Sequence, residues 1–229
     1  MKRAIRHLQQ ADPVMAEMIE RIGPFKMRYR EPSFDAMARS IVFQQLHGKA
    51  AATIFERVRT ACHGVCGPGS LTRAGRGEAP SPHEQDGLTP ASILALSEEQ
   101  LRACGLSRQK LSYLRDLAQR TASGEIDFAR LQEMSDEDVI EHLTRVKGIG
   151  VWSAQMFLIF ALGRLDVMPT VDFGVNTAIR MAYRKRKMPK ARQILALAEK
   201  WRPYRSLACW YLWRYVERQR TNGKAKKKS

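Results

Sequence analysis

The chain has 229 residues, of which 39 are Lys or Arg and 23 are Asp or Glu, so its formal net charge at pH 7 is +16. This length suffices for one large domain or two interdependent lobes without a metal or a disulfide. The positive charge is spread along the chain and predicts a polyanionic partner, of which nucleic acid is the first candidate. The alternative is an ordinary basic protein without such a partner. No apolar run reaches the roughly 18 residues of a membrane span, and residues 1–6 show no signal-peptide pattern. We therefore expect no membrane partner and a cytoplasmic location, associated with the nucleoid in a bacterium.

Apolar residues recur at helical spacing through nearly every structured segment, and no alternating strand pattern is found, so the sequence predicts an all-α fold. Side chains that cap helices mark several starts, and a capping box occupies residues 97–100. Gly48 interrupts one helical stretch before a second run to Val58. The residues that cap or open the successive predicted helices are Asp12, Ser33, Ser97, Ser107, Ser135, Val171, Pro189 and Pro203.

Two stretches depart from the helical pattern. Residues 66–90 are rich in Gly, Pro, Ser and charge, which predicts a long exposed loop. Residues 221–229 form a basic tail that we expect to be mobile, either contacting DNA weakly or only solvated. Cys62, Cys66, Cys104 and Cys209 are scattered without a second pair at zinc-ligand spacing, which predicts reduced thiols and no metal site.

The most informative segment begins where the helix opened by Ser135 ends. Gly148-Ile149-Gly150 forms a tight glycine turn, and another helix starts directly after it. Exposed backbone N–H groups and the positive end of the helix dipole make such a turn a seat for a nucleic-acid phosphate. Short glycine motifs also serve merely as helix caps, so the turn alone leaves both interpretations open.

A second motif follows, Met168-Pro169-Thr170-Val171-Asp172, in which Asp172 lies 22 positions after Gly150. With it the chain resembles the helix-hairpin-helix (HhH-GPD) DNA glycosylases, and in particular the DNA-3-methyladenine glycosylase II (alkylpurine) branch. Further matching segments are 40–51, 105–107 with Lys110, and 201–213, so the resemblance covers roughly 34–216. It implies a glycosylase domain over 1–220 with two helical lobes, one of N- and C-terminal helices and one of about 40–165. The active-site cleft is expected between the lobes.

The resemblance also implies roles for single residues. Asp172 is the expected catalytic carboxylate, although an Asp here can equally be a helix cap. Asp166, in the same loop, is expected to be structural. The expected base pocket consists of Trp152, Trp213, Met156 and Phe43, whereas Trp201 and Trp210 are interpreted as core. Some relatives have Tyr in place of Met156, and close relatives often have a second acid in place of Val171, so the lesion range is open.

DNA contacts are implied at three places. The turn after the first matching helix carries Gln45, expected to fill the gap left by a flipped base, and His47, expected in the groove, although a polar turn can also be plain surface. The hairpin residues Lys147, Gly148, Gly150 and Ser153 are expected at a phosphate. Ser107 and Lys110 are expected at a second phosphate, unless Gly105 is only a helix stop.

The implied function is that of a DNA glycosylase that flips out alkylated, cationic purines such as 3-methyladenine and 7-methylguanine and begins base excision repair in duplex DNA. Members that also nick the backbone have Lys where this chain has Trp152, so we expect no lyase activity. We expect a monomer without a cofactor, although such hairpins often hold a monovalent cation. The alternatives are a glycosylase for other damaged or mismatched bases and a non-catalytic HhH DNA-binding module.

Overall fold

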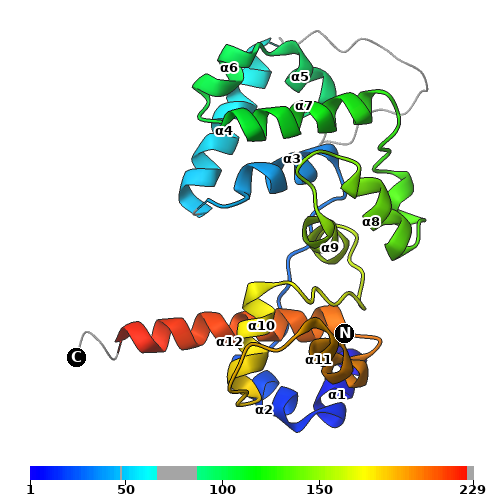
Figure 1. Cartoon of the computed structure of the whole chain (residues 1–229), viewed down its shortest axis with the longest axis vertical. Helices are drawn as coiled ribbons and strands as arrows, with labels where there is room; N and C mark the ends of the chain where they lie inside the picture. The colour runs from blue at the N-terminus through cyan, green and yellow to red at the C-terminus, as the bar shows by residue number, and fades with distance from the viewer. Residues whose placement is uncertain (47, 66–86, 226–229) are drawn as a thin grey trace. The chain divides into compact units, whose positions relative to one another are not determined.

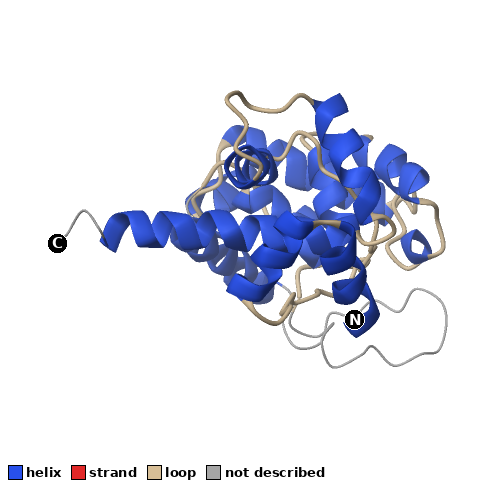
Figure 2. Ribbon diagram, turned by 90° about the horizontal axis from the view of Figure 1, so that it is seen from below, coloured by secondary structure: helices blue, strands red, loops and turns tan. Residues whose placement is uncertain are grey.

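The computed structural model describes residues 1–46, 48–65 and 87–225, and in these residues every regular element is a helix (Figures 1 and 2). The predicted all-α class is therefore confirmed. His47, residues 66–86 of the predicted loop and residues 226–229 of the predicted tail lie outside the described residues.

The chain divides into two compact units. Unit 1 comprises residues 1–29 and 155–229, and unit 2 comprises residues 30–154. The predicted middle lobe, about 40–165, overlaps most of unit 2. Helix α9 (Val151–Phe160) contains the point at which the chain passes from unit 2 to unit 1.

Unit 2 is built around α7, which packs against α3 and α5 (Figure 1). The predicted caps Ser33, Ser97, Ser107 and Ser135 each accept a backbone N–H at the start of their helix. One helix is longer than predicted, because α4 starts at Gly48 and passes the predicted end at Val58. The helices of unit 2 before α9 are α3 (Phe34–Phe43), α4 (Gly48–Val65), α5 (Pro90–Ala95), α6 (Glu98–Ala103), α7 (Arg108–Ala122), the 3-10 turn η1 (Arg130–Gln132) and α8 (Asp136–Thr144).

Unit 1 combines the two ends of the chain. Its helices after α9 begin slightly later than predicted, at Phe173, Ala191 and Arg205. Its first helix, α1, was not predicted, because only Ala4 and Leu8 are buried along it and no cap side chain precedes it. The elements are α1 (Lys2–Ala11), α2 (Pro13–Ile22), α10 (Phe173–Ala182), α11 (Ala191–Ala198), the 3-10 turn η2 (Glu199–Trp201) and α12 (Arg205–Ala225).

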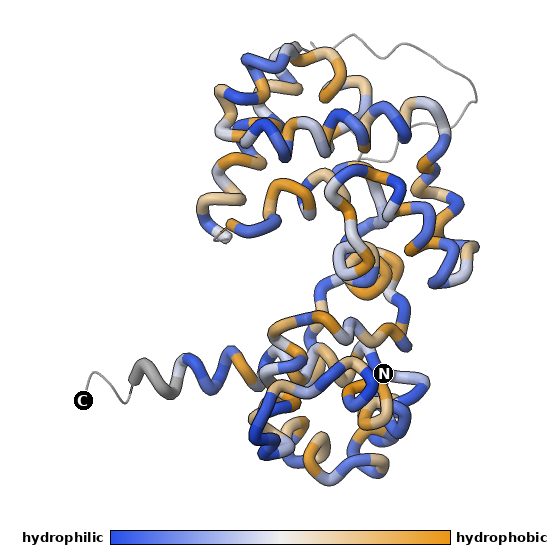
Figure 3. The backbone as a smooth tube through the Cα atoms, viewed as in Figure 1, coloured by the Kyte–Doolittle hydropathy of each residue, from blue (hydrophilic) through white to orange (hydrophobic). Residues whose placement is uncertain are grey.

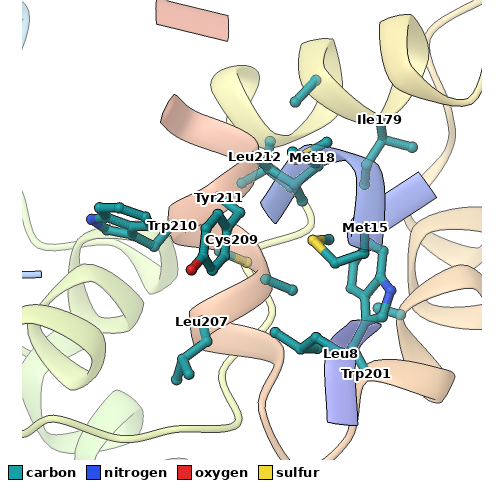
Figure 4. Packing of buried hydrophobic residues seen from close by; sticks show 14 of the residues in the cluster. Leu8, Met15, Met18, Ile179, Trp201, Leu207, Cys209, Trp210, Tyr211 and Leu212 are labelled. Carbon is teal, nitrogen blue, oxygen red and sulfur yellow. The ribbon is translucent and has the colours of Figure 1, made fainter. Parts of the chain in front are cut away.

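The core of unit 1 is shown in Figure 4, where Leu8 and Met15 from the N-terminal helices meet Trp201 and Tyr211 from the C-terminal ones. These four side chains are fully buried. Trp210 also belongs to this cluster, so the interpretation of Trp201 and Trp210 as core is confirmed. The burial of large side chains from both chain ends explains why residues 1–29 fold with residues 155–229.

A buried carboxylate joins the same segments. Asp12 caps α2 by accepting the N–H of Val14 at 3.0 Å. Its Oδ2 accepts the Tyr183 hydroxyl, the Trp201 indole N–H at 2.9 Å and the Lys200 ammonium at 3.0 Å. Burial by itself raises the pKa of Asp12, but the hydrogen bonds from Tyr183, Trp201 and Lys200 outweigh it and hold this pKa below its usual range.

Candidate functional site

Asp172 is the N-cap of α10 and is buried. Its Oδ1 accepts two hydrogen bonds, from the backbone N–H of Val175 at 2.7 Å and from the indole N–H of Trp213 at 2.9 Å. The carboxylate is thus both a helix cap and the partner of an aromatic side chain from α12. Its negative charge is favourable at this position because the N-terminus of α10 carries positive partial charge.

The Trp213 ring is held by neighbours that sequence reasoning missed. It stacks on Phe160 of α9, with 5.4 Å between ring centroids and 26° between ring planes. Gly174 lies against it, since a Cβ on Gly174 would approach Trp213 Cδ1 to 2.9 Å and Asp172 Oδ1 to 3.1 Å. Any larger residue at position 174 would therefore push apart the indole and the carboxylate.

Apolar surface flanks the buried carboxylate on both sides in sequence. Val171 is 66% exposed and Phe173 is 68% exposed, although both are large apolar residues. The loop before them is fixed by the amide of Asn176, which donates to the carbonyl of Thr170 at 3.0 Å. Large apolar side chains that are exposed together mark interaction or ligand-binding surfaces in soluble proteins. Phe173 was not among the site residues predicted from the sequence.

Asp166, the other acid of this loop, is engaged elsewhere. It accepts the Arg205 guanidinium through both carboxylate oxygens, at 2.7 and 3.0 Å, and Arg202 at 2.8 Å. These contacts join the loop to the start of α12. They agree with the interpretation of Asp166 as structural.

The other expected pocket residues occupy different surroundings. Trp152 is 41% exposed near the start of α9, and the half-buried Met156 follows one turn later. Phe43 lies in unit 2, where the centroids of its ring and of the Phe55 ring are 6.5 Å apart. The Arg39 guanidinium lies 4.0 Å from the centroid of the Phe43 ring. Of the expected pocket set, the structure thus brings Trp213 directly to Asp172 and places Phe43 in the packing of α3 against α4.

The glycine hairpin between α8 and α9 requires its first glycine. Gly148 has φ +78°, and a Cβ there would lie 2.1 Å from Cδ2 of Tyr113. A Cβ on Gly150 would meet no atom within 4 Å, so the space above the start of α9 is open. The first N–H groups of an α-helix have no partner within the helix, and at Gly150–Ser153 they suit a phosphate. Since Ser153 is itself buried, we expect its backbone, not its hydroxyl, to contribute.

Two side chains from other elements bind the hairpin backbone. Asp116 of α7 accepts the N–H of Lys147 at 2.9 Å and the Arg120 guanidinium at 3.0 Å. The amide of Gln44 donates to the carbonyl of Gly148 at 3.0 Å. Burial raises the pKa of Asp116 less than the hydrogen bonds from Lys147 and Arg120 lower it, so this carboxyl is held ionised.

The turn after α3 carries Gln45, which is exposed and has φ +56°. The ammonium of Lys110 donates to the carbonyls on either side of Phe43, those of Val42 at 2.6 Å and Gln44 at 2.8 Å. Ser107 caps α7 by accepting the N–H of Lys110 at 3.3 Å. Both residues expected at a second phosphate are therefore engaged within the protein.

The profile of the HhH-GPD superfamily of base excision DNA repair proteins matches residues 38–203. The chain belongs to this superfamily. It is 34% identical over 213 residues to DNA-3-methyladenine glycosylase 1 of Schizosaccharomyces pombe, a match that covers 91% of this chain and 84% of the relative.

Solved structures give the same placement. The S. pombe 3-methyladenine DNA glycosylase in complex with abasic DNA superposes with a TM-score of 0.73, at 33% identity, over 92% of this chain and 95% of that one. A DNA-3-methyladenine glycosidase from Bacillus halodurans superposes with a TM-score of 0.74, at 31% identity, over 92% of this chain and 87% of that one. The family inferred from the hairpin and the Asp172 loop is confirmed.

In the described ranges, no three His, Cys, Asp or Glu side chains gather at metal-ligand distance. Cys62, Cys104 and Cys209 are buried, and none of the three is in a disulfide among the described residues. Among the described helices, none is both long and apolar enough to span a membrane.

Proposed function

We propose that the protein is a monofunctional DNA glycosylase that flips alkylated, cationic purines, such as 3-methyladenine and 7-methylguanine, out of duplex DNA and hydrolyses their N-glycosidic bond to begin base excision repair. The observation that carries the proposal is the Asp172–Trp213 pair, a buried carboxylate hydrogen-bonded to an indole beside exposed apolar side chains. The names of the relatives, 3-methyladenine DNA glycosylases, support the same substrate class.

The chemistry requires stabilisation of positive charge on the sugar. As the bond from C1′ to the base nitrogen breaks, its electron pair goes to the base and the sugar becomes oxocarbenium-like. Asp172 is fixed by two hydrogen bonds to the same oxygen, so its charge is oriented before the reaction and costs no reorganisation during it. Water then bonds to C1′ and releases its proton, for which this carboxylate is the acceptor in our proposal.

A single carboxylate suffices because an alkylated purine is already cationic. The departing base becomes neutral on receiving the bonding electrons, so no general acid is needed, unlike the paired carboxylates of ordinary glycosidases. Electron-rich rings favour the cation over normal bases, since a desolvated cation–π contact is worth about 2 kcal/mol. Trp213 with its stacked Phe160, the exposed Phe173 and Trp152 are the aromatic side chains that we propose for this selection, and Met156 would adapt to several base shapes.

DNA binding in this proposal uses the hairpin and the Gln45 turn. The N–H groups at Gly148, Gly150 and Ser153 bind a phosphate, with Lys147 near it, and the hairpin carbonyls are candidates for a monovalent cation. Gln45 enters the duplex when the base leaves it. We further propose a monomer without an organic cofactor that acts on chromosomal DNA, in the cytoplasm or at the nucleoid if the host is a bacterium.

Incubation with duplexes that each carry one defined lesion tests the function. We expect release of 3-methyladenine and 7-methylguanine, with an abasic product whose backbone stays intact until alkali is added. Borohydride should trap no covalent adduct, because Trp152 stands where the lyase nucleophile would be. Release only of oxidised, deaminated or mispaired bases would replace the substrate class, and binding without release of any base would favour the non-catalytic module. Strong borohydride trapping would remove the monofunctional assignment.

A further inference from the structure

Helix α7 contacts both of the backbone segments assigned to DNA. Lys110, Tyr113 and Asp116 follow one another at three-residue spacing, which places them on one broad face of the helix. Lys110 binds the carbonyls of Val42 and Gln44 at the Gln45 turn. Tyr113 packs against Gly148, and Asp116 binds the N–H of Lys147 in the hairpin.

The two segments are also joined directly. The Gln44 amide donates to Gly148 across 104 positions of sequence. Helix α7, the turn and the hairpin therefore form a closed ring of contacts within unit 2. The ring includes Gln45, whose left-handed backbone is unfavourable for a residue with a side chain and persists only where its surroundings fix it.

We propose that Lys110 and Asp116 are positioning residues, with α7 setting the Gln45 turn and the phosphate-binding hairpin in fixed register. Lys110 holds the turn, Asp116 holds the hairpin, and a phosphate bound at the hairpin then determines where Gln45 meets the base stack. This inference rests on the proposed function, because it takes Gln45 as the residue that replaces the flipped base. It gives Lys110 a role through the turn instead of at a phosphate.

Lys110→Met tests the proposal, since Met keeps the length of the stem and removes the donor. Single-turnover excision from a stable duplex should fall on the order of tenfold, the scale of one charge-assisted hydrogen bond. The loss should be smaller when the lesion lies in a mispair, where extrusion is already cheap. The salt slope of binding to undamaged duplex should stay unchanged, and Lys110→Arg, which can donate to the same carbonyls, should restore the rate.

A phosphate contact predicts a different pattern. If Lys110 binds DNA, the slope of log K against log salt in Lys110→Met should become shallower by about 0.9, and stable and mispaired lesions should lose equally. That result would overturn the proposal.

Gln44→Ala provides a second variant, which keeps the core because Gln44 is partly exposed. Its loss of excision should likewise be smaller when the lesion lies in a mispair. If the wild-type protein excised no lesion, the proposed function would be refuted. Base flipping can still be compared between the variants in that case, by the fluorescence of a 2-aminopurine placed beside the lesion.

A second, independent observation concerns the connection from α10 to α11. Residues 180–192, the basic segment, contain seven cations and no acid. None of the seven forms an ion pair with an acidic residue in the described part of the chain. The segment is ordered by the buried Pro189 and by Tyr183, which donates to Asp12, and it is strongly hydrophilic in Figure 3. Its cations are Arg180, Arg184, Lys185, Arg186, Lys187, Lys190 and Arg192.

Arg184, one of these cations, has a backbone conformation that is unfavourable for a residue with a side chain. It has φ +50°, and the N–H of Lys185 bonds to the carbonyl of Arg180 at 2.8 Å. This is the helix-ending geometry in which glycine is the favoured residue. A strained non-glycine residue points to a use for its side chain.

We propose that the basic segment binds the phosphates of duplex DNA away from the lesion. It follows the C-terminus of α10, about 15 Å along the helix from the Asp172 cap at 1.5 Å per residue. A contact at this distance does not touch the reacting nucleotide. It therefore contributes to binding of undamaged DNA without contributing to catalysis.

The test uses Arg184→Gly with Arg186→Gln and Lys187→Gln, on undamaged duplex. The salt slope should become shallower by up to about 2.7, which is about 0.9 for each of three lost phosphate contacts, and affinity should fall on the order of tenfold at physiological salt. Excision on a saturating short duplex should stay unchanged. Thermal stability should be equal or higher, because glycine suits the left-handed position.

The matched control removes three exposed cations from α1 of the same unit, Lys2→Gln, Arg3→Gln and Arg6→Gln. It changes the net charge equally and should alter the slope less. If the two triple variants changed the salt slope equally, the basic segment would contribute only through the net charge of the protein, and the proposal would be overturned. An unchanged slope in the first variant would overturn it as well. The salt slope and the affinity are both measured on undamaged duplex, so neither depends on base excision.

Discussion

Asp172→Asn is expected to lower single-turnover excision of a methylated purine by on the order of a hundredfold or more, the scale of losing one preorganised electrostatic group. The change is nearly isosteric. The Asn oxygen can still accept from Val175 and from Trp213, so the α10 cap and the indole position are retained. Only the negative charge is lost, and it is this charge that the oxocarbenium-like sugar requires. The measurement is excision with enzyme in excess over duplex, together with DNA affinity and thermal unfolding.

Asp166→Asn serves as the control from the same loop. Its carboxylate binds Arg205 and Arg202, so this variant should lose stability but should retain the excision rate of its folded fraction. A near-normal rate in Asp172→Asn would refute the catalytic assignment. A rate in Asp166→Asn that falls as far as in Asp172→Asn would show that loop position, not charge beside the sugar, governs the chemistry.

Local rules account for what was predictable from the sequence. Helix starts at Ser33, Ser97, Ser107 and Ser135 depend on a side chain bonding to a backbone N–H three residues away, and the structure shows each bond. The glycine hairpin is equally local. Asp172 was open to two interpretations, and it is a cap that also contacts the Trp213 indole.

Long-range contacts account for what was missed. Phe160 lies in α9, whose sequence is predominantly apolar (Figure 3). The sequence therefore does not distinguish Phe160, which stacks on Trp213, from an ordinary core residue. Asp116 resembles a solvated charge on an amphipathic helix, and its contact with Lys147 spans 31 positions. Lys110 was expected at a phosphate because only the fold reveals the carbonyls of α3 beside it. A single sequence contains no signal for such pairs.

Asp12→Ala is expected to destabilise the protein by about 3 to 5 kcal/mol, the cost of removing one partner from a buried charged network. The substitution removes the cap of α2 and leaves Tyr183, Trp201 and Lys200 without their shared acceptor. Because Trp201 and α12 belong to the same core, the loss should extend to the unit that holds Asp172 and Trp213. Urea unfolding of the variant and of the wild type measures the difference. Glu17→Ala, which removes an exposed ion pair with Arg21, is the control and should cost at most about 1 kcal/mol.

Acid should weaken this contribution in a defined direction. The folded-state pKa of Asp12 is held below its usual value, so its carboxylate stabilises the fold fully above the unfolded pKa of about 4, and this stabilisation is lost as the pH falls through the folded pKa. The comparison is best made with Asp12→Asn, which keeps an acceptor for Val14 but has no charge for Lys200. The difference in unfolding free energy between wild type and Asp12→Asn should be constant from about pH 5 to pH 7 and should shrink below about pH 4. A difference independent of pH down to the acid unfolding range would mean that shape and hydrogen bonding at position 12, not ionisation, stabilise unit 1.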